Sequence, residues 1–190
     1  MPAVGKSGLA KIISNHFGIV SLAKDDFKEV LFDTIGFNSR EEKLKLGVAS
    51  MDMMYLVAGM LIKTGQSFIL DNNFENSSRP GLEKLMSNSG YRVLTVQLKA
   101  PVEIIYNRFI ERDKSPDRHR GHVVNTCYPE IGDAAEPVIP LEVFRERYIG
   151  RGMNDFSYGD LMVVDATDPS KIDYDRVLNE ITAWMESIDE

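Results

Sequence analysis

Short apolar runs alternate along the chain with longer segments in which apolar residues recur every three or four positions. The runs predict β-strands over 19–22, 67–70, 92–98 and 161–164. The periodic segments predict helices, the longest of them over 40–63. Strands that alternate with helices are typical of an α/β fold with a largely parallel sheet.

Helical patterns cover most of the remaining chain. They predict helices that open at Gly8 and that span 27–35, 80–90, 101–112, 141–148 and 171–188. Residues 113–140 interrupt the series, because they are rich in Pro, Gly, His, Asp and Arg and show little periodicity. A loop of that length in a compact domain usually has a function. We therefore expect a lid over about 113–140.

Composition narrows the class of protein. A chain of 190 residues is expected to form a single domain over 1–190. The net charge of -7 disfavours a broad nucleic-acid-binding face, since phosphate neutralisation needs clustered Lys and Arg. Cys127 is the single cysteine, so no intramolecular disulfide can form. No apolar run approaches the roughly 20 residues of a membrane span and no signal-peptide pattern is present, so we expect a cytoplasmic protein without a membrane partner.

The most informative motif is Gly5-Lys6-Ser7, which has the form of the second half of a phosphate-binding loop, G-x-x-x-x-G-K-[ST]. In such a loop, backbone N–H groups and the N-terminus of the following helix hold the phosphates. The lysine neutralises phosphate oxygens and the serine hydroxyl reaches Mg²⁺. We therefore expect ATP to bind at Gly5, Lys6, Ser7 and Gly8, with Mg²⁺ at Ser7. The alternative is a surface G-K-S at a disordered N-terminus.

The first half of this motif lies outside the printed sequence. Counting back from Gly5 places the first glycine one position before Met1, and the strand that should launch the loop is absent too. We expect that the start was assigned to an internal methionine or that upstream residues were lost. Intact-mass analysis of the native protein would then show about ten further N-terminal residues, enough for a strand and the missing glycine.

Polar residues follow three of the predicted strands, at Asp25-Asp26, at Asp71-Asn72-Asn73 and at 165–168. Ligands of open α/β sheets bind beyond these carboxyl ends. Asp25 is the candidate general base for a hydroxyl acceptor, and its neighbours Lys24 and Lys28 would hold it ionised and could grip an anionic substrate. Asp71 is a candidate Mg²⁺ ligand of the Walker B kind. The alternative is that Asp26 and Asp71 cap helices or form turns, and this alternative has equal weight for 165–168.

Two arginines mark the entrance to the expected lid. Arg108 and Arg112 are four residues apart on a predicted helix and therefore leave it on one face. A basic lid can exclude water and stabilise the charge of a phosphoryl-transfer transition state, and we assign that role to Arg112. Ion pairing with nearby carboxylates on a solvated surface is the alternative. The roles of Arg118, His119 and His122 stay open, and zinc is disfavoured because neither Cys nor a third His accompanies the two histidines.

Four segments together resemble the P-loop kinase group known as AAA-domain or zeta-toxin-like predicted kinases, and within it the kinase domain of polynucleotide 5′-hydroxyl kinases. The segments are Gly5-Lys6-Ser7, I-V-S-L-A-K-D-D-F-K at 19–28, F-I-L-D-N-N-F at 68–74 and R-F-I-E-R at 108–112. The resemblance covers nearly the whole chain. It implies an α/β three-layer sandwich around a parallel sheet of order 2-3-1-4-5, whose strand 1 is absent or truncated here. At Gly8 the group commonly has Thr.

The resemblance also implies roles for individual residues. Asp25 would be the general base, Lys28 would contact the acceptor, and Arg108 and Arg112 would contact ATP. We further expect Asn73 and Arg79 to bind the substrate. Since members of the group phosphorylate very different acceptors, the fold does not name the acceptor.

The sequence thus favours an ATP- and Mg²⁺-dependent kinase that acts on a hydroxyl of a small molecule. A polynucleotide 5′-hydroxyl kinase is the first alternative, although the acidic charge makes a nucleic-acid partner less favoured. A nucleotide-binding protein without transfer activity is the second alternative, which the truncated loop motif keeps open. Neither the oligomeric state nor the acceptor can be read from the sequence.

Overall fold

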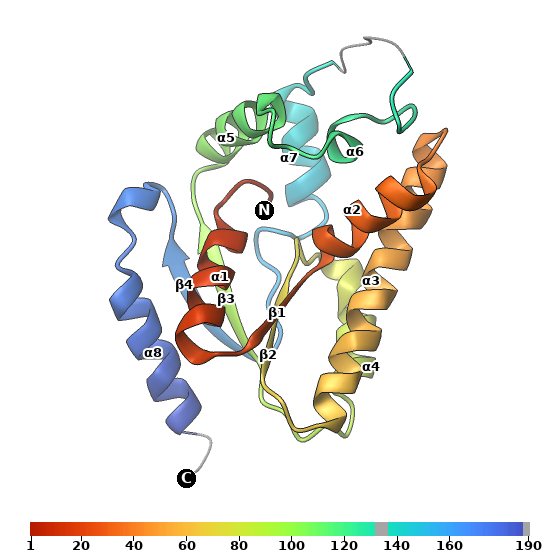
Figure 1. Cartoon of the computed structure of the whole chain (residues 1–190). Helices are drawn as coiled ribbons and strands as arrows, with labels where there is room; N and C mark the ends of the chain where they lie inside the picture. Colours follow the sequence, from red (N-terminus) through yellow and green to blue (C-terminus); the bar gives the residue numbers. More distant parts are fainter. Residues whose placement is uncertain (132–136, 188–190) are drawn as a thin grey trace.

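The strands form two separate parallel pairs in the computed structural model, which describes residues 1–131 and 137–187. β1 (Val20–Ala23) pairs with β2 (Phe68–Asp71), and β3 (Leu94–Lys99) pairs with β4 (Asp160–Asp165). The expected α/β class with parallel strands is therefore confirmed. Each pair is joined through helices, as a parallel connection requires (Figure 1).

The order of the whole sheet stays a prediction. The two pairs correspond to the neighbours 2-3 and 4-5 of the expected order, but within the described residues β2 and β3 are not hydrogen-bonded to each other. No strand of the described chain lies between them, so each keeps an edge without a strand partner. The N-terminal residues pack nearby, where Val4 is fully buried in the same cluster as Leu98 of β3.

Helices account for most of the remaining described chain, and Figure 1 shows them around the strand pairs. The α-helices are α1 (Lys6–Phe17), α2 (Lys24–Ile35), α3 (Arg40–Lys63), α4 (Arg79–Met86), α5 (Val102–Lys114), α6 (Arg120–Val123), α7 (Leu141–Ile149) and α8 (Tyr174–Glu186). Two short 3₁₀ helices, η1 (Asn76–Ser78) and η2 (Pro169–Lys171), precede α4 and α8.

Several helix boundaries differ from expectation. α2 begins at Lys24 rather than Phe27, which places Asp25 and Asp26 in its first turn, where their negative charge complements the helix dipole. α4 ends at Met86, before the predicted end at 90. α8 begins at Tyr174 because the side chain of Asp173 caps it by accepting from the N–H of Arg176, and its predicted end at 188 lies outside the described residues.

The expected lid is more ordered than a structureless loop. α5 extends into it as far as Lys114, α6 forms inside it, and Phe37 and Tyr128 form an antiparallel bridge through two backbone hydrogen bonds of 2.8 Å. The sequence shows none of this, because α6 has only four residues and the bridge joins distant segments. Residues 132–136 of the expected lid lie outside the described part of the structure.

Two apolar clusters hold the layers together. The larger one joins β3 and β4 to α1, α5, α7 and α8, with Leu98, Val164 and Phe144 among its buried members. The second lies between β1, β2 and α3, around Leu22, Met54 and Ala58. α1 contacts both β1 and β2 and also contributes Leu9 and Ile13 to the larger cluster, so it bridges the two strand pairs.

α3 is the single helix of the described residues whose length and apolar composition would suffice to cross a membrane, with a mean hydropathy of 1.4 over its most apolar window. Such a helix is weak evidence for a membrane, because covering helices of globular folds pass the same criterion. α3 contacts β1, β2, α2 and α4, and its Met54 and Ala58 are completely buried in the second cluster. These contacts are those of a covering layer.

Two methionines of α3 provide a matched test of this packing. Met54→Ala should lower the free energy of unfolding by about 2–5 kcal/mol, because it removes a completely buried side chain and leaves a cavity. Met60, on the same helix, is 55% exposed, so Met60→Ala should change the free energy of unfolding by no more than about 0.5 kcal/mol. Urea denaturation followed by circular dichroism measures both. Equal losses would show that α3 does not pack as described.

Candidate active site

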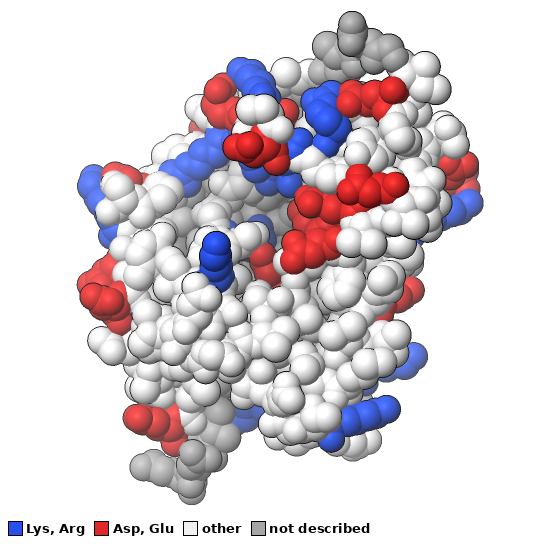
Figure 2. All heavy atoms as spheres, viewed as in Figure 1, with Lys and Arg blue, Asp and Glu red and all other residues white. Residues whose placement is uncertain are grey.

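A pocket of about 410 Å³ opens where the N-terminus of α1 meets the carboxyl ends of β1 and β2, with α5 on its far side. This volume suits a small-molecule ligand. The space-filling view shows a hollow on this face, with basic side chains along one rim and acidic side chains over α2 on the other (Figure 2). Nine of the residues expected to form the site line this pocket: Gly5, Lys6, Ser7, Gly8, Asp25, Asp71, Asn73, Arg108 and Arg112.

The backbone at Gly5 turns the chain into α1. Its φ of 103° lies in the left-handed region, which side chains other than hydrogen disfavour, so a glycine is required at this position. The first hydrogen bond of the helix runs from the N–H of Leu9 to the carbonyl of Gly5, at 3.2 Å. The N–H groups of Lys6, Ser7 and Gly8 precede it and have no acceptor within the helix. The pocket therefore begins with the positive end of a helix, a setting that favours an anion.

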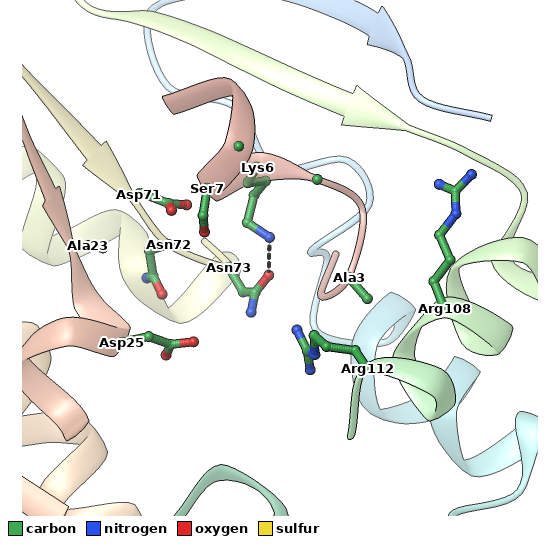
Figure 3. Close-up of a pocket in the computed structure, with 12 residues that line it drawn as sticks. Ala3, Lys6, Ser7, Ala23, Asp25, Asp71, Asn72, Asn73, Arg108 and Arg112 are labelled. Atoms are coloured by element: carbon green, nitrogen blue, oxygen red, sulfur yellow. Dashed lines mark hydrogen bonds between the residues drawn. The ribbon is translucent and has the colours of Figure 1, made fainter. Parts of the chain in front are cut away.

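Lys6 extends from this turn into the pocket. Its Nζ donates to the carbonyl oxygen of Met1 and to Oδ1 of Asn73, both at 2.7 Å (Figure 3). Burial lowers the pKa of Lys6 to about 8, an effect that the negative charges of Asp71 and Asp25 offset only in part. Because both hydrogen-bond partners are neutral, the positive charge of Lys6 remains available to an anionic ligand.

Asp25 projects into the pocket from the first turn of α2, opposite Lys6 (Figure 3). Burial alone would raise its pKa, but the positive charges around it outweigh burial and lower it: His122 when protonated, then Arg118, Lys28 and Lys24. The N-cap of α2 is Ala23, without a side-chain capping hydrogen bond, so the adjacent Asp26 does not cap the helix as its alternative interpretation had it. An ionised carboxylate that faces a pocket can accept a proton from a ligand.

Asp71 ends β2 and is buried at the floor of the same pocket as Ser7. A carboxylate and a hydroxyl fit Mg²⁺, which takes few ligands from a protein when phosphates and water supply the rest. Within the described ranges, no three His, Cys, Asp or Glu side chains are arranged to hold a metal by themselves. Ser7 and Asp71 are therefore the residues that would hold a metal together with a bound phosphate.

The turn alternative describes the end of β4. The carboxylate of Asp165 accepts from the N–H of Thr167 at 2.8 Å, and Asp168 caps η2 by accepting from the N–H of Ser170 at 3.1 Å. Both carboxylates thus accept hydrogen bonds from backbone N–H groups two residues further along the chain, and neither lines the pocket.

The two arginines of α5 line the pocket in different ways. Arg112 points toward Asn73 and Asp25 (Figure 3), although it also pairs with Asp113 at 3.1 Å. Arg108 donates to the carbonyl oxygens of Ala166 and Thr167, both at 2.7 Å, and so ties α5 to the end of β4. Arg112 therefore forms an ion pair with a nearby carboxylate, as the alternative interpretation expected, and also lines the pocket.

Two residues expected to bind the substrate do not line the pocket. Arg79 begins α4, and its guanidinium donates to the carbonyl oxygen of Ser157 at 3.0 Å and stacks over the ring of Phe156. Both contacts hold the guanidinium outside the pocket. Arg79 thus lies outside this pocket, and its role in substrate binding stays a prediction. Lys28 lies one turn beyond Asp25 on α2, with Nζ 5.2 Å from the ring centre of Phe32. Burial, reinforced by repulsion from Lys24, lowers the pKa of Lys28 to about 8.

The structure also reveals residues to which sequence reasoning gave no role. Asn72 lines the pocket beside Asp71, and its position in the polar triplet after β2 was a usable signal. Arg118 and His122 approach Asp25 from the lid, each at 4.0 Å. Their presence in a long basic loop was visible, but their partner on α2 was not.

Comparison with known proteins agrees with a kinase-like fold. The chain matches no known family model. It is 24% identical over 188 residues to the L-seryl-tRNA(Sec) kinase of Methanococcus maripaludis, a match that covers 95% of this chain and 62% of the relative. The chain thus spans less than two thirds of the length of that curated relative.

A solved structure is similar over almost the whole chain. The crystal structure of a provisionally assigned kinase from Chloroflexus aurantiacus superimposes with a TM-score of 0.78 and 26% identity, covering 96% of this chain and 92% of that protein. Together the two similarities support a phosphotransferase function in general. They do not establish the subgroup of kinases or the acceptor.

The lowered pKa of Lys6 predicts a proton linkage. An anion in the pocket should restore the pKa of Lys6 toward its ordinary value, so pyrophosphate binding near pH 8.5 should take up protons. Calorimetric titration in buffers of different ionisation enthalpy measures this uptake. It should disappear in Lys6→Met. Lys28→Met, which removes a lysine of similar pKa outside the pocket, should retain it; the reverse result would contradict the assignment.

Proposed function

We propose that this protein is an ATP- and Mg²⁺-dependent kinase that transfers the γ-phosphoryl group of ATP to a hydroxyl of a small molecule. One observation carries the proposal: the N-terminus of α1, with Lys6 and Ser7 and with Asp71 beside them, faces Asp25 across a single pocket (Figure 3). Phosphoryl transfer needs just such a pairing, because one wall must hold phosphates and the other must receive the acceptor.

The wall of the pocket that would hold phosphates is the N-terminus of α1, which supplies positive charge and N–H groups without acceptors in the helix. The first N–H groups of α1 and the ammonium group of Lys6 would hold the β- and γ-phosphates. Since Lys6 is bound to two neutral oxygens, a phosphate can replace them without breaking an ion pair. Ser7 and Asp71 would hold Mg²⁺, which when bound neutralises charge on the phosphate oxygens.

The acceptor wall is built around Asp25. Its lowered pKa keeps the carboxylate ionised at neutral pH, so it can accept the proton of an acceptor hydroxyl as the oxygen attacks phosphorus. Arg112, on the far side of the pocket, would stabilise the negative charge that spreads over the transferring group. These residues orient the reactants and balance charge, which is most of what a phosphoryl-transfer enzyme contributes.

An aminoacyl-tRNA hydroxyl is a second candidate acceptor, favoured by the similarity to the L-seryl-tRNA(Sec) kinase. A net charge of -7 argues against it, because binding of an RNA backbone relies on clustered cations. The acidic side chains over α2 on one rim of the hollow would also repel a polyanion (Figure 2). The small-molecule acceptor therefore remains the leading proposal.

An acceptor screen with γ-labelled ATP tests these possibilities directly. Small hydroxyl compounds, seryl-tRNA and oligonucleotides with 5′-hydroxyl ends are compared at equal concentration. Transfer to a small compound supports the proposal, whereas transfer only to RNA or to oligonucleotide ends overturns the small-molecule acceptor. Thermal shift with Mg-ATP covers the remaining case, since stabilisation without any transfer would indicate a nucleotide-binding protein.

A single substitution tests the role of Asp25. Asp25→Asn should reduce transfer by about 10²–10⁴-fold, because the amide cannot accept the proton, while the affinity for ATP stays nearly the same. Asp26→Asn is the matched control, since Asp26 is the adjacent carboxylate in the same turn but does not line the pocket. It should retain most of the activity. Wild-type rates in Asp25→Asn would remove Asp25 as the base.

A further inference from the structure

Three carboxylates form a row along α2. Asp25, Glu29 and Asp33 are spaced four residues apart, so they project from one face of the helix. Asp25 lies at the pocket end of the row, and Asp33 lies two turns away. The lid segment 118–128 covers this row, and each carboxylate faces at least one of its polar side chains.

The contacts along the row differ in length. Nε2 of His119 lies 3.0 Å from Oδ1 of Asp33, and the hydroxyl of Tyr128 donates to the same oxygen at 2.8 Å. Nε2 of His122 lies 2.8 Å from Oε1 of Glu29. At Asp25 both lid groups stop short, because Nε2 of His122 and the guanidinium of Arg118 are each 4.0 Å from Oδ2. The row is therefore hydrogen-bonded at two carboxylates and open at the one that faces the pocket.

Close packing holds α6 against α2 at this point. Phe32 is completely buried beneath the lid, and a Cβ at Gly121 would lie 2.4 Å from its ring, so a glycine is needed for this approach. The ring of His122 meets Phe32 edge-on, with 5.5 Å between ring centres. From α3, the buried ammonium of Lys43 donates to the carbonyl oxygens of His122 and Val124. His122 is thus fixed through both its backbone and its ring.

The state of His122 suits a hydrogen-bond donor. Its side chain is only 6% exposed, and burial lowers its pKa to about 3, so the imidazole is neutral near pH 7. A carboxylate can only accept, which assigns the single proton of the ring to Nε2, facing Glu29. His122 therefore adds no positive charge beside Asp25 at neutral pH.

The lack of a hydrogen bond between the lid and Asp25 matters because Arg118 lies close enough to form one after a small movement. Its Nε is buried without a hydrogen-bond partner among the described residues, and its distances to Asp113 and Asp25, 3.7 and 4.0 Å, are too long for hydrogen bonds. A guanidinium in this state gains by moving onto Asp25 as a charge-assisted pair. A carboxylate engaged in that way would be a poor proton acceptor for a ligand.

We propose that His122 is a positioning residue of the active site, which keeps Asp25 available to the acceptor by holding α6, and with it Arg118, at a fixed distance from α2 through Glu29. This inference rests on the proposed function in taking Asp25 as the base. It adds a role for a lid histidine that acts through Glu29 rather than through contact with the acceptor.

Three variants separate positioning from a general structural contribution. His122→Leu removes the donor to Glu29 but retains an apolar side chain against Phe32. His122→Gln retains an N–H that can reach Glu29. Tyr128→Phe removes a hydrogen bond between the same lid and the same helix, at Asp33, two turns from Asp25, and keeps the aromatic ring. The kcat and the KM for ATP are measured with the acceptor found in the screen.

Positioning predicts unequal effects. His122→Leu should lower kcat by about 10- to 100-fold with the KM for ATP unchanged, because a misplacement of about 1 Å can cost that much. His122→Gln should recover most of this loss, and Tyr128→Phe should retain kcat within about threefold, since its contact lies two turns from Asp25. Equal losses in His122→Leu and Tyr128→Phe, or no loss in His122→Leu, would overturn the inference.

A second readout does not depend on activity. Because His122→Leu also removes the charge of His122, which itself lowers the pKa of Asp25, Arg118→Met is made in each background and the pKa of Asp25 is followed by NMR of ¹³C-labelled carboxyl groups. If Arg118 closes on Asp25 in His122→Leu, Arg118→Met should raise the pKa of Asp25 by more in that variant than in the wild type, whereas in Tyr128→Phe the rise should match the wild type. An equal rise in His122→Leu and in the wild type would refute the inference even if no acceptor is found, whereas a larger rise in a protein that transfers to no acceptor would show that the proposed function, not the positioning, is wrong.

Discussion

The site depends on positive charge that the protein holds without neutralising it. The N-terminus of α1 and the ammonium of Lys6 meet at the mouth of the pocket, and the direct partners of Lys6 are two neutral oxygens. Burial of this charge is costly, as the lowered pKa of Lys6 shows. The negative charges of Asp71 and Asp25 reduce this cost without forming ion pairs with Lys6. An anionic ligand is therefore the natural complement of the site.

The carboxylate that opposes this charge is placed by a helix rather than by a loop. Because α2 begins directly after β1, Asp25 stands in a first helical turn whose backbone is fixed, and its side chain enters the pocket from there. The same helix carries Glu29 and Asp33 toward the lid. α2 thus contributes Asp25 to the pocket from its first turn and binds the lid through Glu29 and Asp33 on the next two turns.

The fold accounts for a phosphotransferase in general and leaves the acceptor open. A TM-score of 0.78 to a kinase-like structure describes how the strands and helices are arranged. Proteins that share a fold differ in acceptor through the side chains around the site rather than through the sheet. The residues closest to Asp25 here include Arg118 and His122, which belong to the lid, a part of the molecule that a shared sheet does not constrain.

Local patterns in the sequence determined the α/β class, the position of nearly every helix and strand, and the polar residues at the strand ends. They also marked Gly5, Lys6, Ser7, Asp25 and Asp71, because a turn motif and an aspartate after an apolar run are read over a few neighbouring residues. Only the tertiary structure decided that Arg79 turns to Ser157 and that His122 meets Glu29. These contacts join residues 78 and 93 positions apart, and they depend on how distant helices pack in space, which no local periodicity encodes.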